Sequence, residues 1–185
     1  TGIPVLVDGA QSVGAIPVAA AGLDFLTISG QKWLCGPDST GALVVAEPER
    51  LRVARPSYFS QAAYEETGSF EPAEGAARFD PGWLSSAALA GLVTALRLPP
   101  AWRFERAAAM AARCRELLAP LAEVVPGEST LVAFRDGDPP ATVARLAEAG
   151  VVVRDIPKTG LVRVSCGWWT NEDDLQRLTA ALSAT

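Results

Sequence analysis

Three short apolar runs lie within the first 45 residues, and each ends at polar or turn-forming residues. Residues 3–7 (IPVLV) run into Asp8, residues 25–28 (FLTI) run into Ser29, and residues 41–45 (GALVV) stop just before a Glu-Pro pair. Short runs without polar alternation are typical of strands that are covered on both faces. The sequence therefore predicts an edge region of a mixed α/β sheet whose first strand is buried and parallel to a neighbour.

A pair of prolines, Pro99-Pro100, divides the rest of the chain. Before it, 52–81 is rich in Pro, Gly and aromatic residues and predicts a long irregular loop, and 84–98 has helical spacing of leucine and valine. Beyond it the pattern predicts helix, strand, helix, two strands and helix, at 101–118, 130–134, 140–149, 151–154, 161–165 and from Thr170–Asp173 onward. We therefore expect two domains, 1–98 and 99–185, the second a small α+β layer.

Composition excludes several function classes. The net charge is −5 and no basic stripe is present, which argues against nucleic acid as a partner. No apolar run approaches the roughly 18 residues of a membrane span. The chain has no histidine, so it contains neither a Ser-His-Asp triad nor a histidine metal site. We expect no metal site, and any general base must be Lys, Asp, Glu, Tyr or Cys.

The three cysteines, Cys35, Cys114 and Cys166, are odd in number and widely spaced. This spacing fits neither a disulfide framework nor a zinc site. The simplest compartment for such a chain is a reducing cytoplasm.

Polar side chains follow the first two predicted strands. Asp8 comes directly after the first, and Ser29, Gln31 and Lys32 come after the second. Because ligands of open parallel sheets bind beyond the carboxyl ends of the strands, Asp8 and Lys32 are expected to face one crevice. Taken alone, an Asp in this position is more often a turn residue, and a Lys in a loop is more often a surface charge.

Lys32 is one of only two lysines in the chain, which has 14 arginines. It precedes Trp33 and Leu34, so we expect its amine to be partly desolvated and ready to form an imine. A carboxylate nearby favours the ammonium unless it pairs with another cation. The pyridinium nitrogen of pyridoxal 5'-phosphate (PLP) is such a cation, and PLP sites combine a Schiff-base lysine with an acidic partner of that nitrogen.

Two motifs carry a resemblance to a known family. They are DGAQSVG at 8–14 and SGQKW at 29–33, the latter followed by Gly36-Pro37 and Gly41. Further matches occur in the expected order at Asp24-Phe25, Arg78-Phe79-Asp80, Val162–Ser165 and Thr170–Leu175. Together they resemble the aminotransferase class V (cysteine desulfurase-like) family of fold type I PLP-dependent enzymes. The resemblance implies that 1–98 is the C-terminal part of the PLP-binding large domain, with a mixed sheet, and that 99–185 is the small α+β C-terminal domain.

The resemblance also implies a role for each matching residue. Lys32 resembles the lysine that forms the Schiff base with PLP and then moves the substrate's α-proton. Asp8 resembles the partner of the ring nitrogen, and Gln11 the donor to the ring's 3-oxygen. Ser29 and Gln31 resemble ligands of the phosphate, and Arg163 resembles the arginine that clamps the substrate carboxylate.

The chain departs from the family in three places. Gln31 stands where many members have His, and Gly82-Trp83 replaces a Gly-Thr whose threonine reaches the phosphate of the neighbouring subunit. The family's upstream half, with the residue that stacks on the ring, is not in this sequence. The chain alone is therefore not expected to form a complete site.

The type of reaction stays open between alternatives. The link at 155–160 has no cysteine, which disfavours a desulfurase that forms a persulfide on its own thiol. The sequence favours C–S lyase or desulfurase-like β-elimination on a cysteine-type amino acid. The alternatives are transamination and a degenerate domain without catalysis. The family further implies a homodimer with a small amino-acid substrate. The cysteine usage favours the cytoplasm, and the charge and hydropathy favour neither a nucleic acid nor a membrane as partner.

Overall fold

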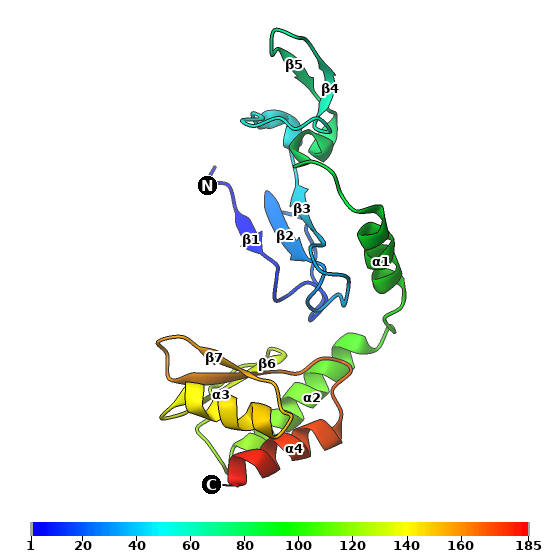
Figure 1. Cartoon of the computed structure of the whole chain (residues 1–185). Helices are drawn as coiled ribbons and strands as arrows, with labels where there is room; N and C mark the ends of the chain where they lie inside the picture. The colour runs from blue at the N-terminus through cyan, green and yellow to red at the C-terminus, as the bar shows by residue number, and fades with distance from the viewer. Residues whose placement is uncertain (1, 185) are drawn as a thin grey trace. The chain divides into compact units, whose positions relative to one another are not determined.

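The computed structural model describes residues 2–184, which form two compact units that meet at Pro99–Pro100 (Figure 1). The division lies one residue beyond the predicted boundary. The assignment of the units to a cofactor-binding domain and a small domain stays a prediction. Among the described residues, none of the helices combines the length and apolar character that crossing a bilayer requires.

The first unit is built on a three-stranded sheet of β1 (Leu6–Asp8), β2 (Phe25–Ser29) and β3 (Gly41–Val45). The order is β1-β2-β3, with β1 parallel and β3 antiparallel to β2. The predicted mixed sheet is therefore confirmed. The register places Asp8 opposite Thr27, so the carboxyl ends of β1 and β2 lie at the same edge.

The first strand is parallel, as predicted, but it is not buried. Leu6 is 60% exposed and Val5 is 47% exposed. The continuous apolar pattern predicted cover on both faces, whereas the other elements of this unit leave these side chains uncovered. The prediction of a buried first strand is wrong for the described chain.

The segment predicted as an irregular loop contains regular structure. β4 (Gln61–Tyr64) and β5 (Phe70–Pro72) form an antiparallel hairpin, flanked by the short 3-10 helices η1 (Pro48–Arg50) and η2 (Gly75–Phe79). The hairpin turns at Gly68, whose φ of 89° favours glycine. A Thr-Gly pair between two aromatic residues was the sequence signal for this turn.

α1 (Ser86–Arg97) closes the first unit and begins where Ser85 accepts a hydrogen bond from the backbone N–H of Ala88. Its predicted apolar face is only partly covered. Leu92 lies against the loop that follows β2, since a Cβ placed on Gly36 would lie 2.8 Å from its Cδ1. Leu89, Val93 and Leu96 stay between 39% and 55% exposed.

The second unit has the predicted order of elements. They are α2 (Arg103–Leu118), β6 (Leu131–Arg135), α3 (Pro139–Glu148), β7 (Arg154–Ile156), β8 (Leu161–Ser165) and α4 (Glu172–Ser183). The strands form an antiparallel sheet in the order β6-β8-β7. α4 begins with a capping box between Asn171 and Asp174.

β7 begins three residues later than predicted. Gly150, with a φ of 75°, ends α3, and the N–H of Val151 donates to the carbonyl of Leu146 at 2.8 Å. This bond belongs to a Schellman-type helix end. The valines at 151–153 therefore follow the end of the helix and are not part of the strand.

Substitution of a core residue in the second unit is expected to have a large effect on the stability of the fold. Phe134, in β6, is 1% exposed and packs in a cluster with residues from α2, α3, β8 and α4. We expect Phe134→Ala to lower the free energy of unfolding by about 3–5 kcal/mol, because it removes buried apolar contacts and leaves a cavity. Urea unfolding followed by far-UV circular dichroism measures this loss. Val152→Ala is the control, since Val152 is 88% exposed in the same unit; equal losses in the two variants would contradict the packing.

Candidate active site

The structure places five of the six predicted site residues in the two segments that follow β1 and β2. Asp8 is the last residue of β1 and Ser29 the last of β2. Gln11 lies in the turn at 9–13, and Gln31 and Lys32 lie in the loop at 30–40 that leads to β3. Both segments start from the carboxyl ends of neighbouring parallel strands.

Asp8 is held by donors on one side of its carboxylate. Its Oδ1 accepts from the backbone N–H of Ala10 and from the hydroxyl of Thr27, each at 3.0 Å. The Ala10 N–H, the Thr27 hydroxyl and, to a smaller extent, the positive charge of Lys32 lower the pKa of Asp8 against the effect of burial. The ionised form of Asp8 is therefore favoured, and among residues 2–184 its Oδ2 accepts no hydrogen bond.

Thr27 was not identified from the sequence, and its role gives a prediction. Thr27→Val removes one of the two donors to Oδ1, so the pKa of Asp8 should rise yet stay below its ordinary value, since the larger effect of Ala10 remains. A lowered pKa means that Asp8 stabilises the fold above its unfolded-state pKa and that this contribution is lost as pH falls through the folded value. Because the variant raises the folded-state pKa of Asp8, the pH range between that pKa and the unfolded-state pKa should become smaller. Carbon-13 NMR titration of the Asp8 carboxyl measures the change, and an unchanged pKa would contradict the contact; Thr67→Val, in the exposed hairpin turn, is the control.

Backbone hydrogen bonds close the loop that carries Lys32. The N–H of Gly30 donates to the carbonyl of Thr40 at 2.8 Å, and the N–H of Gly36 donates to the carbonyl of Gly30 at 2.8 Å. A Cβ on Gly30 would lie 2.2 Å from the Thr40 hydroxyl oxygen, so only glycine fits there. The carbonyl of Lys32 itself accepts from the N–H of Cys35 at 2.9 Å. The backbone that presents Lys32 is thus fixed by four residues of its own loop.

The side chain of Lys32 is exposed in the described chain. The predicted partial desolvation by Trp33 is therefore wrong within this chain, because Trp33 is itself buried and its indole is engaged with Gln11. Ser29 is half-buried and Gln31 is exposed. Their proposed contacts to a phosphate stay a prediction.

Gln11 is joined to the second loop by a side-chain hydrogen bond. The indole N–H of Trp33 donates to its Oε1 at 2.9 Å. Gln11 is exposed, whereas Trp33 is only 7% exposed. The sequence singled out both residues, but it did not indicate that they touch.

Arg163 lies in the second unit, in the middle of β8 between Ala133 of β6 and Arg154 of β7. It is half-buried, and its Nε is buried without a hydrogen-bond partner among residues 2–184. A buried guanidinium N–H without an acceptor is costly, so this side chain is suited to an anionic ligand. Its role as a carboxylate clamp stays a prediction.

The cysteines divide into a buried pair and an exposed residue. Cys114 and Cys166 lie in the core of the second unit at 1% and 0% exposure. A hydrogen bond with Cys166, together with burial, raises the pKa of the Cys114 thiol. Cys35 is exposed, and partial burial of its sulfur raises its pKa. Among residues 2–184, no group of three or more His, Cys, Asp and Glu side chains is arranged to hold a metal ion.

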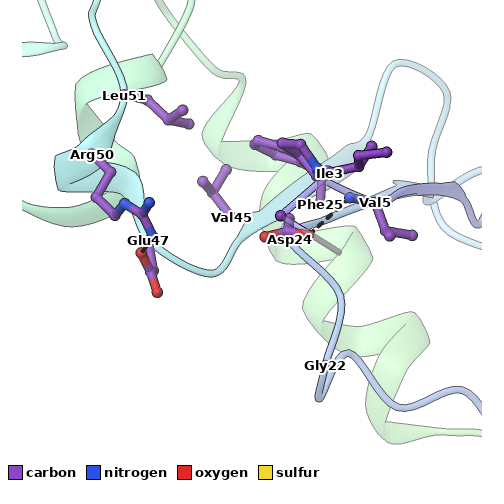
Figure 2. Close-up of a pocket in the computed structure, with 11 residues that line it drawn as sticks. Ile3, Val5, Gly22, Asp24, Phe25, Val45, Glu47, Arg50 and Leu51 are labelled. Carbon is purple, nitrogen blue, oxygen red and sulfur yellow. Dashed lines mark hydrogen bonds and ion pairs between the residues drawn. The ribbon is translucent and has the colours of Figure 1, made fainter.

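A hollow of about 500 Å³ lies at the opposite end of the sheet, where β1 and β2 begin (Figure 2). Its lining includes Asp24, which accepts from the N–H of Val5 at 2.8 Å, and the ion pair of Arg50 and Glu47. None of the predicted site residues lines it. This hollow and the predicted chemistry are therefore at different ends of the strands.

Solved structures share this fold. A C-DES mutant with glycine covalently linked to its PLP cofactor has a TM-score of 0.83 and 27% identity, with 98% of this chain and 51% of that chain covered. The complex of the cystine C–S lyase C-DES with its reaction product cysteine persulfide has a TM-score of 0.81 and 27% identity, with 98% of this chain and 52% of that chain covered. The apo structure of the cysteine desulfurase from Thermococcus onnurineus NA1 has a TM-score of 0.87 and 19% identity, with 98% of this chain and 52% of that chain covered.

The chain thus spans about half the length of the solved structures it matches. No curated protein sequence matches it significantly. A family model described as "Aminotransferase class-V" matches residues 1–178. The predicted fold, that of part of a PLP-dependent fold type I enzyme, is confirmed. The chain belongs to the aminotransferase class-V family.

Proposed function

We propose that this chain supplies the lysine and the ring-nitrogen partner of a PLP-dependent enzyme that acts on an amino acid. The observation that carries the proposal is Asp8, whose carboxylate is fixed at the end of β1 and feels the charge of Lys32 from the next loop. The 27% identity to C-DES, which has been solved with PLP, and the family match support it.

The side chains present fit this cofactor. Asp8 offers a carboxylate oxygen, Oδ2, beyond the one that Ala10 and Thr27 occupy. Gln11 offers an amide N–H to an oxygen, because its own oxygen already accepts from Trp33. Lys32 offers an exposed primary amine on a closed loop. When bound, PLP supplies an aldehyde that reacts with amines and a ring that accepts electrons.

Each residue then has a definite task. Asp8 stays ionised and keeps the proton on the ring nitrogen, because its pKa is lowered. Lys32 would hold the cofactor through Nζ and would serve as the base that takes the proton from the substrate Cα. Ser29 and Gln31 donate to the phosphate, and Arg163 binds the substrate carboxylate with its guanidinium.

We propose β-elimination from a cysteine-type substrate as the reaction. The proton on Cα moves to Lys32, the Cβ–S bond breaks with both electrons leaving on sulfur, and water hydrolyses the three-carbon fragment to pyruvate and ammonia. This step needs no protein thiol. It agrees with the burial of Cys114 and Cys166 and with the link between β7 and β8, which has no cysteine. C-DES is a cystine C–S lyase, which favours the same reaction here.

Transamination is the alternative, and the description of the family model favours it. In that reaction Lys32 would both remove the proton from the substrate Cα and donate it again at another carbon, and no C–S bond would break. We further expect the full-length protein to be a homodimer, as the family resemblance implies, and to reside in the cytoplasm, as its cysteine usage suggests.

The full-length protein tests the proposal in two steps. With PLP it should show a visible absorption band that borohydride removes. Incubation with cystine, cysteine and alanine should then give pyruvate and a sulfur product from the first two. Formation of pyridoxamine phosphate with alanine would favour transamination instead, and a protein that takes up no PLP would support the reading as a degenerate domain.

A further inference from the structure

A hydrogen bond between side chains 22 positions apart joins the two strand-end segments. The indole N–H of Trp33 donates to Oε1 of Gln11 at 2.9 Å. The donor is buried at 7% exposure and the acceptor is exposed. A buried, rigid group thus holds a side chain whose other end faces outward.

The chemistry of indole decides which way the glutamine amide points. An indole N–H is a donor only, whereas an amide carries an oxygen acceptor on one side and an NH₂ donor on the other. The amide must therefore turn its oxygen to Trp33, which turns its NH₂ away from it. The contact removes the usual ambiguity between the two amide orientations.

Close packing fixes the backbone that carries the indole. Gly14 has a φ of 93°, and a Cβ there would lie 2.8 Å from the carbonyl carbon of Trp33 and 2.9 Å from its oxygen. The turn after β1 thus presses directly on the loop after β2. Gly9, at the start of that turn, is equally restricted, since its Cβ would lie 2.5 Å from the carbonyl oxygen of Thr27. The backbones of the two segments are therefore packed against each other, and Trp33 is only 7% exposed, which limits movement of its indole.

We infer that Trp33 is a positioning residue that fixes the amide of Gln11 so that its NH₂, and not its oxygen, faces the ring oxygen of the bound cofactor. The inference rests on the proposed function for the identity of that oxygen. Without the indole the amide of Gln11 is free to rotate by half a turn. Its oxygen then faces the ring oxygen of the cofactor, and both are hydrogen-bond acceptors. Trp33 thereby acts through Gln11 and not on the reacting atoms.

A measurable consequence concerns the charge of the ring oxygen. A donor to that oxygen stabilises its anionic form and so lowers the pH at which the visible band of the PLP-loaded protein titrates. Loss of one hydrogen bond to a charged group should raise that midpoint by about one pH unit and weaken PLP binding about tenfold. We expect both effects in Trp33→Phe, which keeps the aromatic ring and removes the N–H.

A first test uses the full-length protein without cofactor. The indole N–H resonance of Trp33, assigned by its disappearance in Trp33→Phe, should move in Gln11→Ala, which removes the acceptor. Gln11 is exposed, so this variant is expected to fold even if Trp33→Phe does not. An unchanged resonance shows that the contact is absent and overturns the inference, whatever the protein does with PLP.

The second test compares Trp33→Phe, Gln11→Ala and the double variant with PLP bound. If Trp33 acts through Gln11, the double variant has the midpoint and the dissociation constant of Gln11→Ala alone. Additive shifts, or a Trp33→Phe protein that titrates like wild type, overturn the inference. Trp102→Phe, in the second unit, is the control and should match wild type. A wild-type protein that binds no PLP contradicts the proposed function, which separates that failure from failure of the role of Trp33.

Discussion

Replacing Lys32 by alanine is expected to lower the turnover of a cysteine-type substrate by roughly 10⁴-fold, the upper range for loss of a general base that is also the covalent anchor. The physical reason is that the loop contains no second amine, since the chain's other lysine is Lys158. The exposed side chain stands on a loop that Gly30, Thr40 and Gly36 close through backbone hydrogen bonds, so another residue cannot be brought to the same place without opening that loop.

The chain offers a matched control for this prediction, because its other lysine is Lys158. Lys158 lies in the link between β7 and β8, in the second unit, with a φ of 64°. Borohydride treatment of the PLP-loaded protein, followed by peptide mass spectrometry, should find the label on Lys32 in wild type and in Lys158→Ala, and nowhere in Lys32→Ala. Label on Lys158, or a Lys32→Ala protein with wild-type turnover, would remove the basis of the mechanism.

The order of the elements could be predicted from the sequence where local signals agree. β3 and β8 have the predicted bounds because each is a short apolar run between turn residues. β7 was misplaced because a valine run is compatible with a strand and with a helix end, and the glycine before it decided for the helix end. The exposure of β1 could not be predicted from local sequence. A run of apolar residues indicates that a strand is suited to burial, but it does not indicate which elements cover the strand.

The candidate site shows the same division. The residues at the strand ends were predictable, because Asp8 and Ser29 follow apolar runs directly and parallel strands share an edge. The contacts that orient them were not. The bond from Thr27 to Asp8 depends on the register of two strands 19 positions apart, and the bond from Trp33 to Gln11 depends on the fold of two separate turns. Because Trp33 follows Lys32 directly, the sequence suggested that the amine is desolvated. Adjacent side chains in a turn can, however, point in different directions.

Asp8→Asn is expected to reduce turnover by about 10²–10³-fold, the usual effect of removing one preorganised electrostatic contact to a developing charge. Asparagine has nearly the same shape, and its side-chain oxygen is still able to accept from the Ala10 N–H and the Thr27 hydroxyl, which now bind Oδ1. What is lost is the negative charge that, in the proposed function, keeps the proton on the ring nitrogen. The defect should therefore lie in removal of the substrate's α-proton, and the rate of exchange of that proton with deuterated water should fall as much as turnover does.

Asp24→Asn separates this effect from a general loss of charge at the sheet. Asp24 accepts from the N–H of Val5 at 2.8 Å, at the end of β1 and β2 opposite to Asp8, and is not among the predicted site residues. It should keep wild-type exchange and turnover. If Asp8→Asn and Asp24→Asn behaved alike, the carboxylate at the end of β1 would have no special relation to the cofactor, and Lys32 would lack the acidic counterpart on which the proposed chemistry depends.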